Sequence, residues 1–182
     1  MLDFSKNYFD LFGLPVGYII ESSSLADRYR DLQRVVHPDR YANATEQERR
    51  LSVQGASLIN EAFETLKDPI ARAAYLLSLH GIEIDAQNES THDMEFLMQQ
   101  MALREELEEL RSQLGPFESI LDLSSRINKQ LVDLVAQMAV QFEVPTQESL
   151  EDAQEILRKM RFLQKLRAET ERVEAELDEQ LN

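Results

Sequence analysis

The 182-residue sequence contains no cysteine, which excludes disulfides, thiolate metal sites, thiol nucleophiles and cysteine-held iron–sulfur clusters. Its three histidines, His37, His80 and His92, are scattered along the chain, so a metal site built from several histidines is not expected. The sequence also lacks a glycine-rich phosphate loop. We therefore expect no resident metal, no cofactor and no catalytic residues.

Positive charge is scarce, because 19 lysines and arginines stand against 34 aspartates and glutamates, giving a net charge of −15. The deficit lies mainly in the second half of the chain. Residues 1–80 carry 9 basic and 11 acidic side chains, whereas residues 81–182 carry 10 and 23. A surface this acidic repels phosphate backbones, so nucleic acid is not an expected partner.

Long apolar runs are missing as well. The stretch from Ile70 to Ile82 is the only one worth considering as a membrane segment, and it is too short to span a bilayer. The first six residues show neither a basic region followed by an apolar stretch nor an Arg-rich amphipathic presequence. We expect no membrane association, and a reduced cytoplasm is the predicted location.

Helical periodicity fills nearly the whole chain, since apolar residues recur at intervals of three and four and strand alternation is missing. Ser24 and Asp27 resemble a capping box and predict the start of a helix that ends at His37, before Pro38. One face of this helix carries the apolar residues Leu25, Tyr29, Leu32 and Val36.

Two further helices are predicted before residue 82. Thr45 and Glu48 form a capping box that opens the first of them. Its expected buried stripe consists of Leu51, Leu58, Ala62, Phe63 and Leu66. Asp68 caps the second, which has Pro69 in its first turn and stops at Gly81.

Residues 82–91 are polar and mark a change in charge balance, so they predict a linker between a domain of residues 1–81 and a domain of residues 92–182. The second domain contains three amphipathic stretches, expected at about 92–114, 117–142 and 147–181. Short connections between such helices favour an antiparallel three-helix bundle, and the predicted fold class is all-α.

The tripeptide His37-Pro38-Asp39 lies in the loop that follows the predicted second helix. In isolation it would be interpreted as a helix stop with an exposed histidine. Its surroundings change that interpretation, because a locally basic patch in an otherwise acidic protein suggests docking onto an acidic partner. The patch consists of Arg28, Arg30, Arg34 and Arg40.

A short apolar start, a basic amphipathic helix, His-Pro-Asp in a loop and a longer third helix resemble the J domain of DnaJ-type co-chaperones, a helical hairpin with flanking short helices. The resemblance implies docking on a DnaK-like chaperone ATPase and triggering of its ATP hydrolysis. It implies that His37, Pro38 and Asp39 are the trigger and that Arg28, Arg30 and Arg34 are docking charges. Arg40 stands where many members carry lysine and keeps the charge.

A narrower resemblance, to the HscB-type J proteins of iron–sulfur cluster assembly, covers nearly the whole chain. It is carried by Asn7-Tyr8-Phe9-Asp10-Leu11-Phe12-Gly13-Leu14-Pro15, Ile59-Asn60-Glu61-Ala62-Phe63 and Phe96-Leu97-Met98-Gln99-Gln100-Met101. This resemblance implies a non-enzymatic co-chaperone. Its second domain would bind the IscU scaffold protein and deliver it to an HscA-type chaperone.

The first helix of the second domain has two apolar faces. Phe96, Leu103, Leu107, Leu110 and Leu114 share one side of a helical wheel and are expected to face the bundle. A second set, Leu97, Met98 and Met101, lies on the other side together with Glu105 and Glu109. From the pattern alone, this set either binds a partner or packs against the first domain or the linker.

The resemblance favours the partner and implies scaffold contacts at Leu97, Met98, Met101, Glu105 and Glu109. It adds Phe162, whose position on the wheel of its own helix is ambiguous. Ala102 stands where related proteins often carry an acidic residue, so the resemblance does not carry that polar contact over to this chain.

Three other functions remain as alternatives. One is an enzyme with His37 as base and Asp39 as its partner, but no nucleophile lies nearby and the intervening proline makes a direct hydrogen bond awkward. Another is a J-domain adaptor for a different client. The third is a structural helical adaptor without an ATPase partner.

Overall fold

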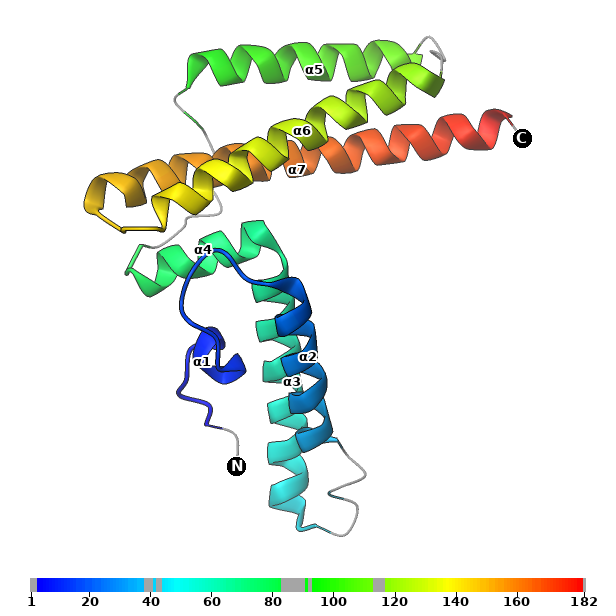
Figure 1. Cartoon of the computed structure of the whole chain (residues 1–182). Coiled ribbons are helices and arrows are strands. Elements are labelled where there is room, and N and C mark those ends of the chain that lie inside the picture. Colours follow the sequence, from blue (N-terminus) through cyan, green and yellow to red (C-terminus); the bar gives the residue numbers. More distant parts are fainter. Residues whose placement is uncertain are drawn as a thin grey trace. The chain divides into compact units, whose positions relative to one another are not determined.

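The computed structural model describes residues 3–37, 41, 44–82, 91, 93–112 and 117–181 (Figure 1). These residues form helices, turns and loops without any strand, so the all-α prediction is confirmed for the described part of the chain. The chain divides into two compact units, residues 1–82 and 83–182. Residues 83–90 of the predicted linker lie outside the described residues, and the predicted linker stays a prediction.

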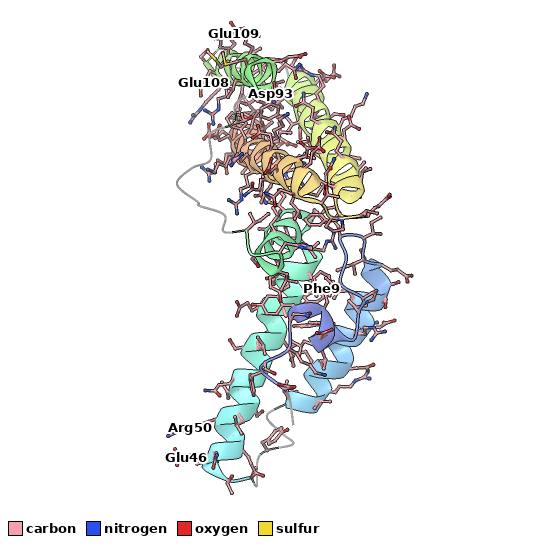
Figure 2. All side chains as sticks on the ribbon, turned by 90° about the vertical axis from the view of Figure 1, so that its left-hand side faces the viewer. Phe9, Glu46, Arg50, Asp93, Glu108 and Glu109 are labelled. Atoms are coloured by element: carbon pink, nitrogen blue, oxygen red, sulfur yellow. The ribbon has the colours of Figure 1, made fainter. Side chains whose placement is uncertain are left out.

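The described residues of the first unit form four helices, of which α2 and α3 lie side by side (Figure 1). The helices are α1 (Tyr8–Phe12), α2 (Ser22–Val36), α3 (Glu46–Lys67) and α4 (Pro69–Leu79). Their apolar faces converge on a core that includes Phe9, labelled in Figure 2 and fully buried. Other buried members of this core are Phe12, Leu25, Ile59, Leu66, Leu76 and Leu77.

The start of α2 differs from the sequence prediction. The helix begins at Ser22 with Glu21 as its N-cap, and no side chain caps it, so the capping box predicted at Ser24 is wrong. The carboxylate of Asp27 instead forms an ion pair with Arg30, one turn further along the helix. Three consecutive serines offer alternative starts, and local sequence rules cannot choose between them. At its other end α2 stops before His37, as predicted.

The capping predictions for α3 and α4 are confirmed. The Thr45 Oγ1 atom accepts from the amide of Glu48, whose carboxylate accepts from the Thr45 amide at 2.8 Å. Asp68 Oδ1 accepts from the amides of Ile70 and Ala71, both at 2.7 Å. Gly81 follows α4 with φ 76°, a conformation that glycine adopts without strain.

The buried stripe of α3 is shifted from the predicted one. Ala62 and Leu66 are buried as expected, but Ile59 takes the core position predicted for Leu58, which is half-buried. One and two turns earlier the stripe continues through Gly55 and Ser52, small residues that an apolar pattern overlooks. Small side chains at these positions let α2 approach α3 closely.

In the second unit the described residues form a bundle of three helices, α5 (Met94–Ser112), α6 (Phe117–Gln141) and α7 (Gln147–Leu181). The helices α6 and α7 have the most extensive contacts, and α5 packs against both of them (Figure 1). The core contains Ile120, Leu123, Ile127, Met138, Leu157, Met160, Leu163 and Leu166, all almost fully buried. The predicted three-helix bundle is therefore confirmed.

Candidate functional site

The predicted trigger begins at the C-terminus of α2. His37 is exposed and forms the C-cap of the helix, with extended backbone angles of φ −58° and ψ 132°. Pro38, Asp39 and Arg40 lie outside the described residues, so the geometry of the tripeptide stays a prediction. Residues after the tripeptide return to the described structure at Tyr41 and Ala44, before α3 begins.

The end of α2 is fixed by a residue that the sequence interpretation missed. Ser52, buried on α3, donates a hydrogen bond from its Oγ to the carbonyl oxygen of Val36 at 2.7 Å. Val36 is the last residue of α2, so its carbonyl has no partner within the helix and requires a donor from elsewhere. A Cβ added at Gly55 would lie 3.3 Å from Val36 Cγ1, which shows how closely α2 and α3 approach each other here.

The predicted docking arginines on α2 have different environments. Arg30 and Arg34 are exposed and form ion pairs with Asp27 and Asp31, respectively. Exposed pairs of this kind contribute little to stability, so both cations can exchange an internal carboxylate for an external one.

Arg28 has a structural contact in addition to its charge. Its Nη1 donates to the carbonyl oxygen of Phe12 at 2.8 Å, at the end of α1. The next residue, Gly13, has φ 61°, and an added Cβ there would lie 2.8 Å from Arg28 Nη1. The guanidinium of Arg28 therefore occupies the space above Gly13 and ties α2 to α1.

The helix α5 presents the two faces predicted from its sequence. Leu103 and Leu107 are buried, at 6% and 3% exposure, and face the bundle. Met98 and Met101 are each 62% exposed, and Leu97 is half-exposed. The predicted exposure of these three residues, hereafter the Leu–Met face, is confirmed.

Acidic residues border the Leu–Met face. Glu105 and Glu109 are exposed on α5, and Figure 2 shows Glu108 and Glu109 on this helix. This arrangement of an apolar surface with a carboxylate border is suited to a partner that presents apolar side chains together with basic ones.

The structure resolves the ambiguous position of Phe162 on α7. The core stripe of this helix runs through Met160, Leu163 and Leu166, and Phe162 is half-buried at its side. Its ring meets the ring of Phe96 edge-to-face, with 6.0 Å between centroids. Phe162 therefore lies beside α5, the helix that carries the Leu–Met face.

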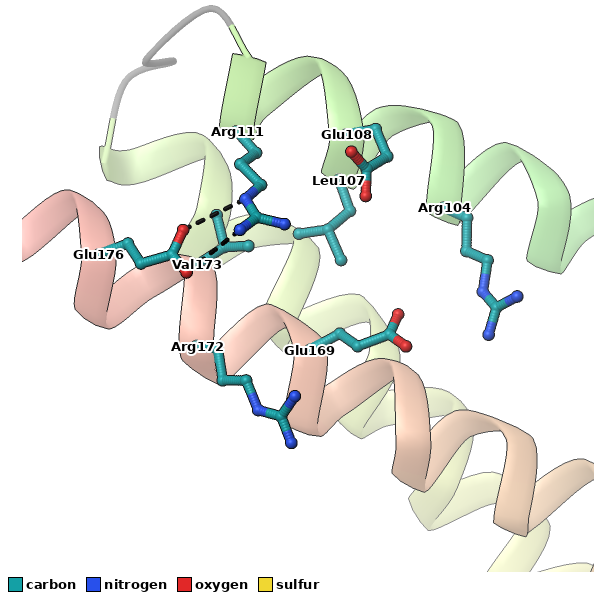
Figure 3. Close-up of a pocket in the computed structure, with 8 residues that line it drawn as sticks. All are labelled: Arg104, Leu107, Glu108, Arg111, Glu169, Arg172, Val173 and Glu176. Atoms are coloured by element: carbon teal, nitrogen blue, oxygen red, sulfur yellow. Dashed lines mark hydrogen bonds and ion pairs between the residues drawn. The ribbon is translucent and has the colours of Figure 1, made fainter.

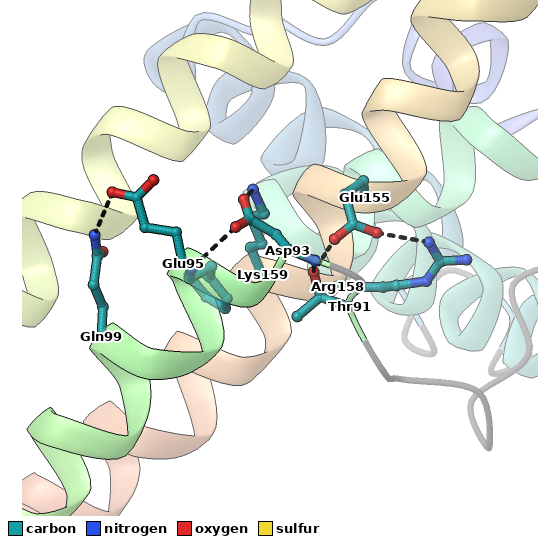
Figure 4. Close-up of polar contacts among 8 residues, drawn as sticks. Thr91, Asp93, Glu95, Gln99, Glu155, Arg158 and Lys159 are labelled. Atoms are coloured by element: carbon teal, nitrogen blue, oxygen red, sulfur yellow. Dashed lines mark hydrogen bonds and ion pairs between the residues drawn. The ribbon is translucent and has the colours of Figure 1, made fainter.

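A polar cluster anchors the start of α5 to α7 (Figure 4). Lys159 Nζ donates to Asp93 Oδ2 at 2.6 Å, while Asp93 Oδ1 accepts from the amide of Phe96 at 3.0 Å. The hydroxyl of Thr91 accepts from the Asp93 amide and donates to Glu155. The hydrogen bond from Lys159, reinforced by the Phe96 amide, lowers the pKa of Asp93.

A cleft of about 500 Å³ lies between α5 and α7 (Figure 3). It is lined by Arg104, Leu107, Glu108, Arg111, Glu169, Arg172, Val173 and Glu176. Across it, the Arg111 guanidinium contacts both carboxylate oxygens of Glu176, at 3.2 and 3.3 Å. The Arg104 guanidinium instead lies over the Phe162 ring, 4.7 Å from its centroid.

Two kinds of site are missing from the described residues. In the ranges that the structure covers, no three histidine, aspartate or glutamate side chains are grouped so that they could hold a metal ion. The same residues include no helix whose length and apolar character would let it cross a membrane.

Comparisons with known proteins match both units. The family model described as HSCB C-terminal oligomerisation domain matches residues 92–171. A curated relative, the co-chaperone protein HscB homolog of Shewanella loihica, is 43% identical over 168 residues, covering 92% of this chain and 97% of the relative.

Two solved structures extend the match to the fold. Chaperone HscB from Vibrio cholerae is 41% identical, with a TM-score of 0.83 over 94% of this chain and 99% of its own. Human co-chaperone HscB is 30% identical, with a TM-score of 0.84 over 93% of this chain and 82% of its own. The predicted architecture, an N-terminal J domain followed by a C-terminal helical bundle, is confirmed. From sequence and fold together, the chain belongs to the HscB family of co-chaperones.

Proposed function

We propose that this protein is a non-enzymatic J-type co-chaperone of iron–sulfur cluster assembly. It stimulates the ATPase of an HscA-type, DnaK-like chaperone and delivers an IscU-type scaffold protein to it. The observation that carries this proposal is the Leu–Met face, which is exposed although α5 already buries a complete stripe through Phe96, Leu103 and Leu107. A helix that needs only one apolar face for its own bundle has a second one available for a client.

The first unit acts on the ATPase. Arg30 and Arg34 steer it to an acidic surface of the chaperone, together with Arg28 and Arg40. His37, Pro38 and Asp39 then bind one conformational state of the ATPase better than the other, which is the only way in which binding can shift that equilibrium.

The second unit holds the client. Leu97, Met98 and Met101 form the apolar centre of its contact, with Phe162 at its side and Glu105 and Glu109 as the charged border. Because one chain carries both functions, docking of the first unit raises the effective concentration of the scaffold at the chaperone.

The trigger is tested by His37→Gln. We expect stimulation of the chaperone ATPase to be lost while the free energy of unfolding changes by under about 0.5 kcal/mol, because His37 is exposed. Steady-state ATPase assays and chemical denaturation measure the two quantities. If the folded variant stimulates the chaperone ATPase normally, His37 is not part of the trigger.

The client site is tested by replacing Leu97, Met98 and Met101 together with alanine. We expect affinity for the scaffold to fall by about 2 kcal/mol or more, with little change in thermal stability. The ATPase stimulation measured without scaffold should be unchanged. If the variant is much less stable but binds the scaffold normally when folded, these residues belong to the core and do not form the client site.

The same assays address the alternative of an adaptor for a different client. A chain that stimulates the ATPase through His37 but gives no further stimulation with the IscU-type scaffold would fit that alternative. A chain without any effect on the ATPase would fit a structural adaptor.

A further inference from the structure

The exposed side of α5 carries a stripe of methionines. Met94, Met98 and Met101 follow one another at intervals of four and three residues, which places their side chains on one side of the helix. They are 67%, 62% and 62% exposed, respectively. The other two methionines in the described ranges, Met138 and Met160, are fully buried in the bundle core. The chain therefore holds two groups of thioethers that differ sharply in their access to solvent.

These exposed thioethers are chemically open to mild oxidants. Cysteine, whose thiolate would compete for a peroxide, is absent from the sequence. A thioether becomes a sulfoxide when its sulfur attacks an oxygen atom of hydrogen peroxide. The oxygen–oxygen bond breaks as the sulfur–oxygen bond forms, the sulfur loses two electrons, and the peroxide is reduced to water. Because the sulfur must reach the oxidant, exposure selects Met94, Met98 and Met101 over the buried pair.

Oxidation would change the chemistry of this side of α5 without touching the bundle core. A sulfoxide is polar and chiral, so it no longer matches an apolar partner surface. If it is buried in a contact, its oxygen loses hydrogen bonds with water, and that loss weakens binding unless the partner supplies a donor. The packing of α5 depends on its opposite side, where Phe96, Leu103 and Leu107 are buried.

We propose that Met94, Met98 and Met101 form a site of reversible oxidation that regulates client binding by the second unit. This inference rests on the proposed function, because Met98 and Met101 belong to the Leu–Met face. A peroxide converts the three thioethers to sulfoxides and weakens the hold on the client, while the fold persists. Methionine sulfoxide reductases reverse the change, with a dithiol oxidised to a disulfide and the sulfoxide oxygen released as water.

Peptide mapping by mass spectrometry tests the selectivity of the site. The full-length chain is treated with hydrogen peroxide, and the gain of one oxygen atom is followed at each methionine over time. We expect oxidation of the exposed group to be about tenfold faster or more, because the sulfurs of Met138 and Met160 react only when the core opens. Equal rates in the two groups would overturn the inference.

Titration calorimetry with a purified IscU-type scaffold tests the consequence. The peroxide is removed before the scaffold is added, so that only this chain is oxidised. We expect the oxidised chain to bind about tenfold more weakly, the size of a polar group buried without a partner, with unchanged helical circular dichroism. Treatment with two methionine sulfoxide reductases, one for each epimer, and dithiothreitol should restore the affinity.

The matched control is a variant that carries Met94→Leu, Met98→Leu and Met101→Leu. Leucine is apolar and similar in volume but has no sulfur to oxidise. Comparing this variant with itself before and after treatment, we expect peroxide to leave its affinity unchanged. An equal loss in the leucine variant and the parent would place the effect elsewhere in the chain and overturn the inference.

A last comparison separates failure of the inference from failure of the proposed function. If the untreated parent chain binds the scaffold and full oxidation of the three methionines leaves that affinity unchanged, only the inference falls. If the untreated parent chain does not bind the scaffold, the proposed function falls and the inference falls with it.

Discussion

Ser52 illustrates how one buried hydroxyl can support a functional loop from another helix. Its bond to the Val36 carbonyl satisfies the last carbonyl of α2, which has no partner within the helix. We expect Ser52→Ala to lower the free energy of unfolding by about 1–3 kcal/mol, because the carbonyl would be buried without a partner. Ser57→Ala, the same change at an exposed position of α3, should cost under about 0.5 kcal/mol in the same urea titration. Equal costs would contradict a special role for Ser52.

Asp93 makes the stability of the bundle sensitive to acid. Because its hydrogen bond with Lys159 lowers its pKa in the folded state, the unfolded chain takes up a proton at higher pH than the folded one. The stabilisation is complete at neutral pH and is lost as the pH falls below about 4. Asp93→Asn should therefore flatten the acid limb of a plot of melting temperature against pH. Asp152→Asn, at an exposed site on α7, should leave that limb as steep as in the parent chain.

At the scale of single residues, the sequence predicts well those hydrogen bonds that join near neighbours in the chain. The caps at Thr45 and Asp68 depend on neighbours three residues away or fewer, and both predictions are confirmed. The bond of Arg28 to the Phe12 carbonyl joins residues 16 positions apart, and that of Lys159 to Asp93 joins residues 66 apart. The periodicity of apolar residues in the sequence does not predict such contacts, because they depend on how the helices pack.

On α5, buried side chains are expected to contribute to stability and exposed side chains to the proposed client contact. We expect Leu103→Ala to destabilise the chain by roughly 2–5 kcal/mol, because it leaves a cavity in the bundle. Met98→Ala, on the opposite side of the helix, should barely change the melting temperature. Thermal unfolding of the two variants, followed by circular dichroism, measures the contrast. A similar loss for both would mean that the Leu–Met face is part of the core.

The helices that were predicted best are those with long, regular apolar stripes. The bounds of α7 and the start of α6 agree with the bounds predicted from the sequence. A proline shortly before each start marks that start in the sequence. In the predicted stripe of α3, Ala62 and Leu66 are correct and Leu58 stands in place of Ile59, because the stripe continues through Gly55 and Ser52, which are not large apolar residues. The Leu–Met face was predicted as exposed, but whether it binds a client depends on a partner that the chain does not contain.

The division into two units predicts that the first can fold by itself. Residues 1–82 form a compact unit with its own buried core around Phe9, Ile59 and Leu76. A fragment of these residues should be helical, unfold cooperatively and stimulate the chaperone ATPase weakly, without further enhancement by the scaffold. Circular dichroism and the ATPase assay measure both properties. Equal stimulation by fragment and full chain, with the scaffold present, would contradict delivery by the second unit.

A separate core in each unit also has an evolutionary consequence. The exposed side of α5 belongs to the second unit, whereas the buried residues Phe9, Ile59 and Leu76 belong to the first. If the proposed roles hold, a lineage can adapt the Leu–Met face to a changing client while α2 and the proposed trigger stay matched to an unchanged chaperone. Recombination near residue 82 could exchange one unit between relatives and leave the other intact, so the two halves of such proteins can have separate histories.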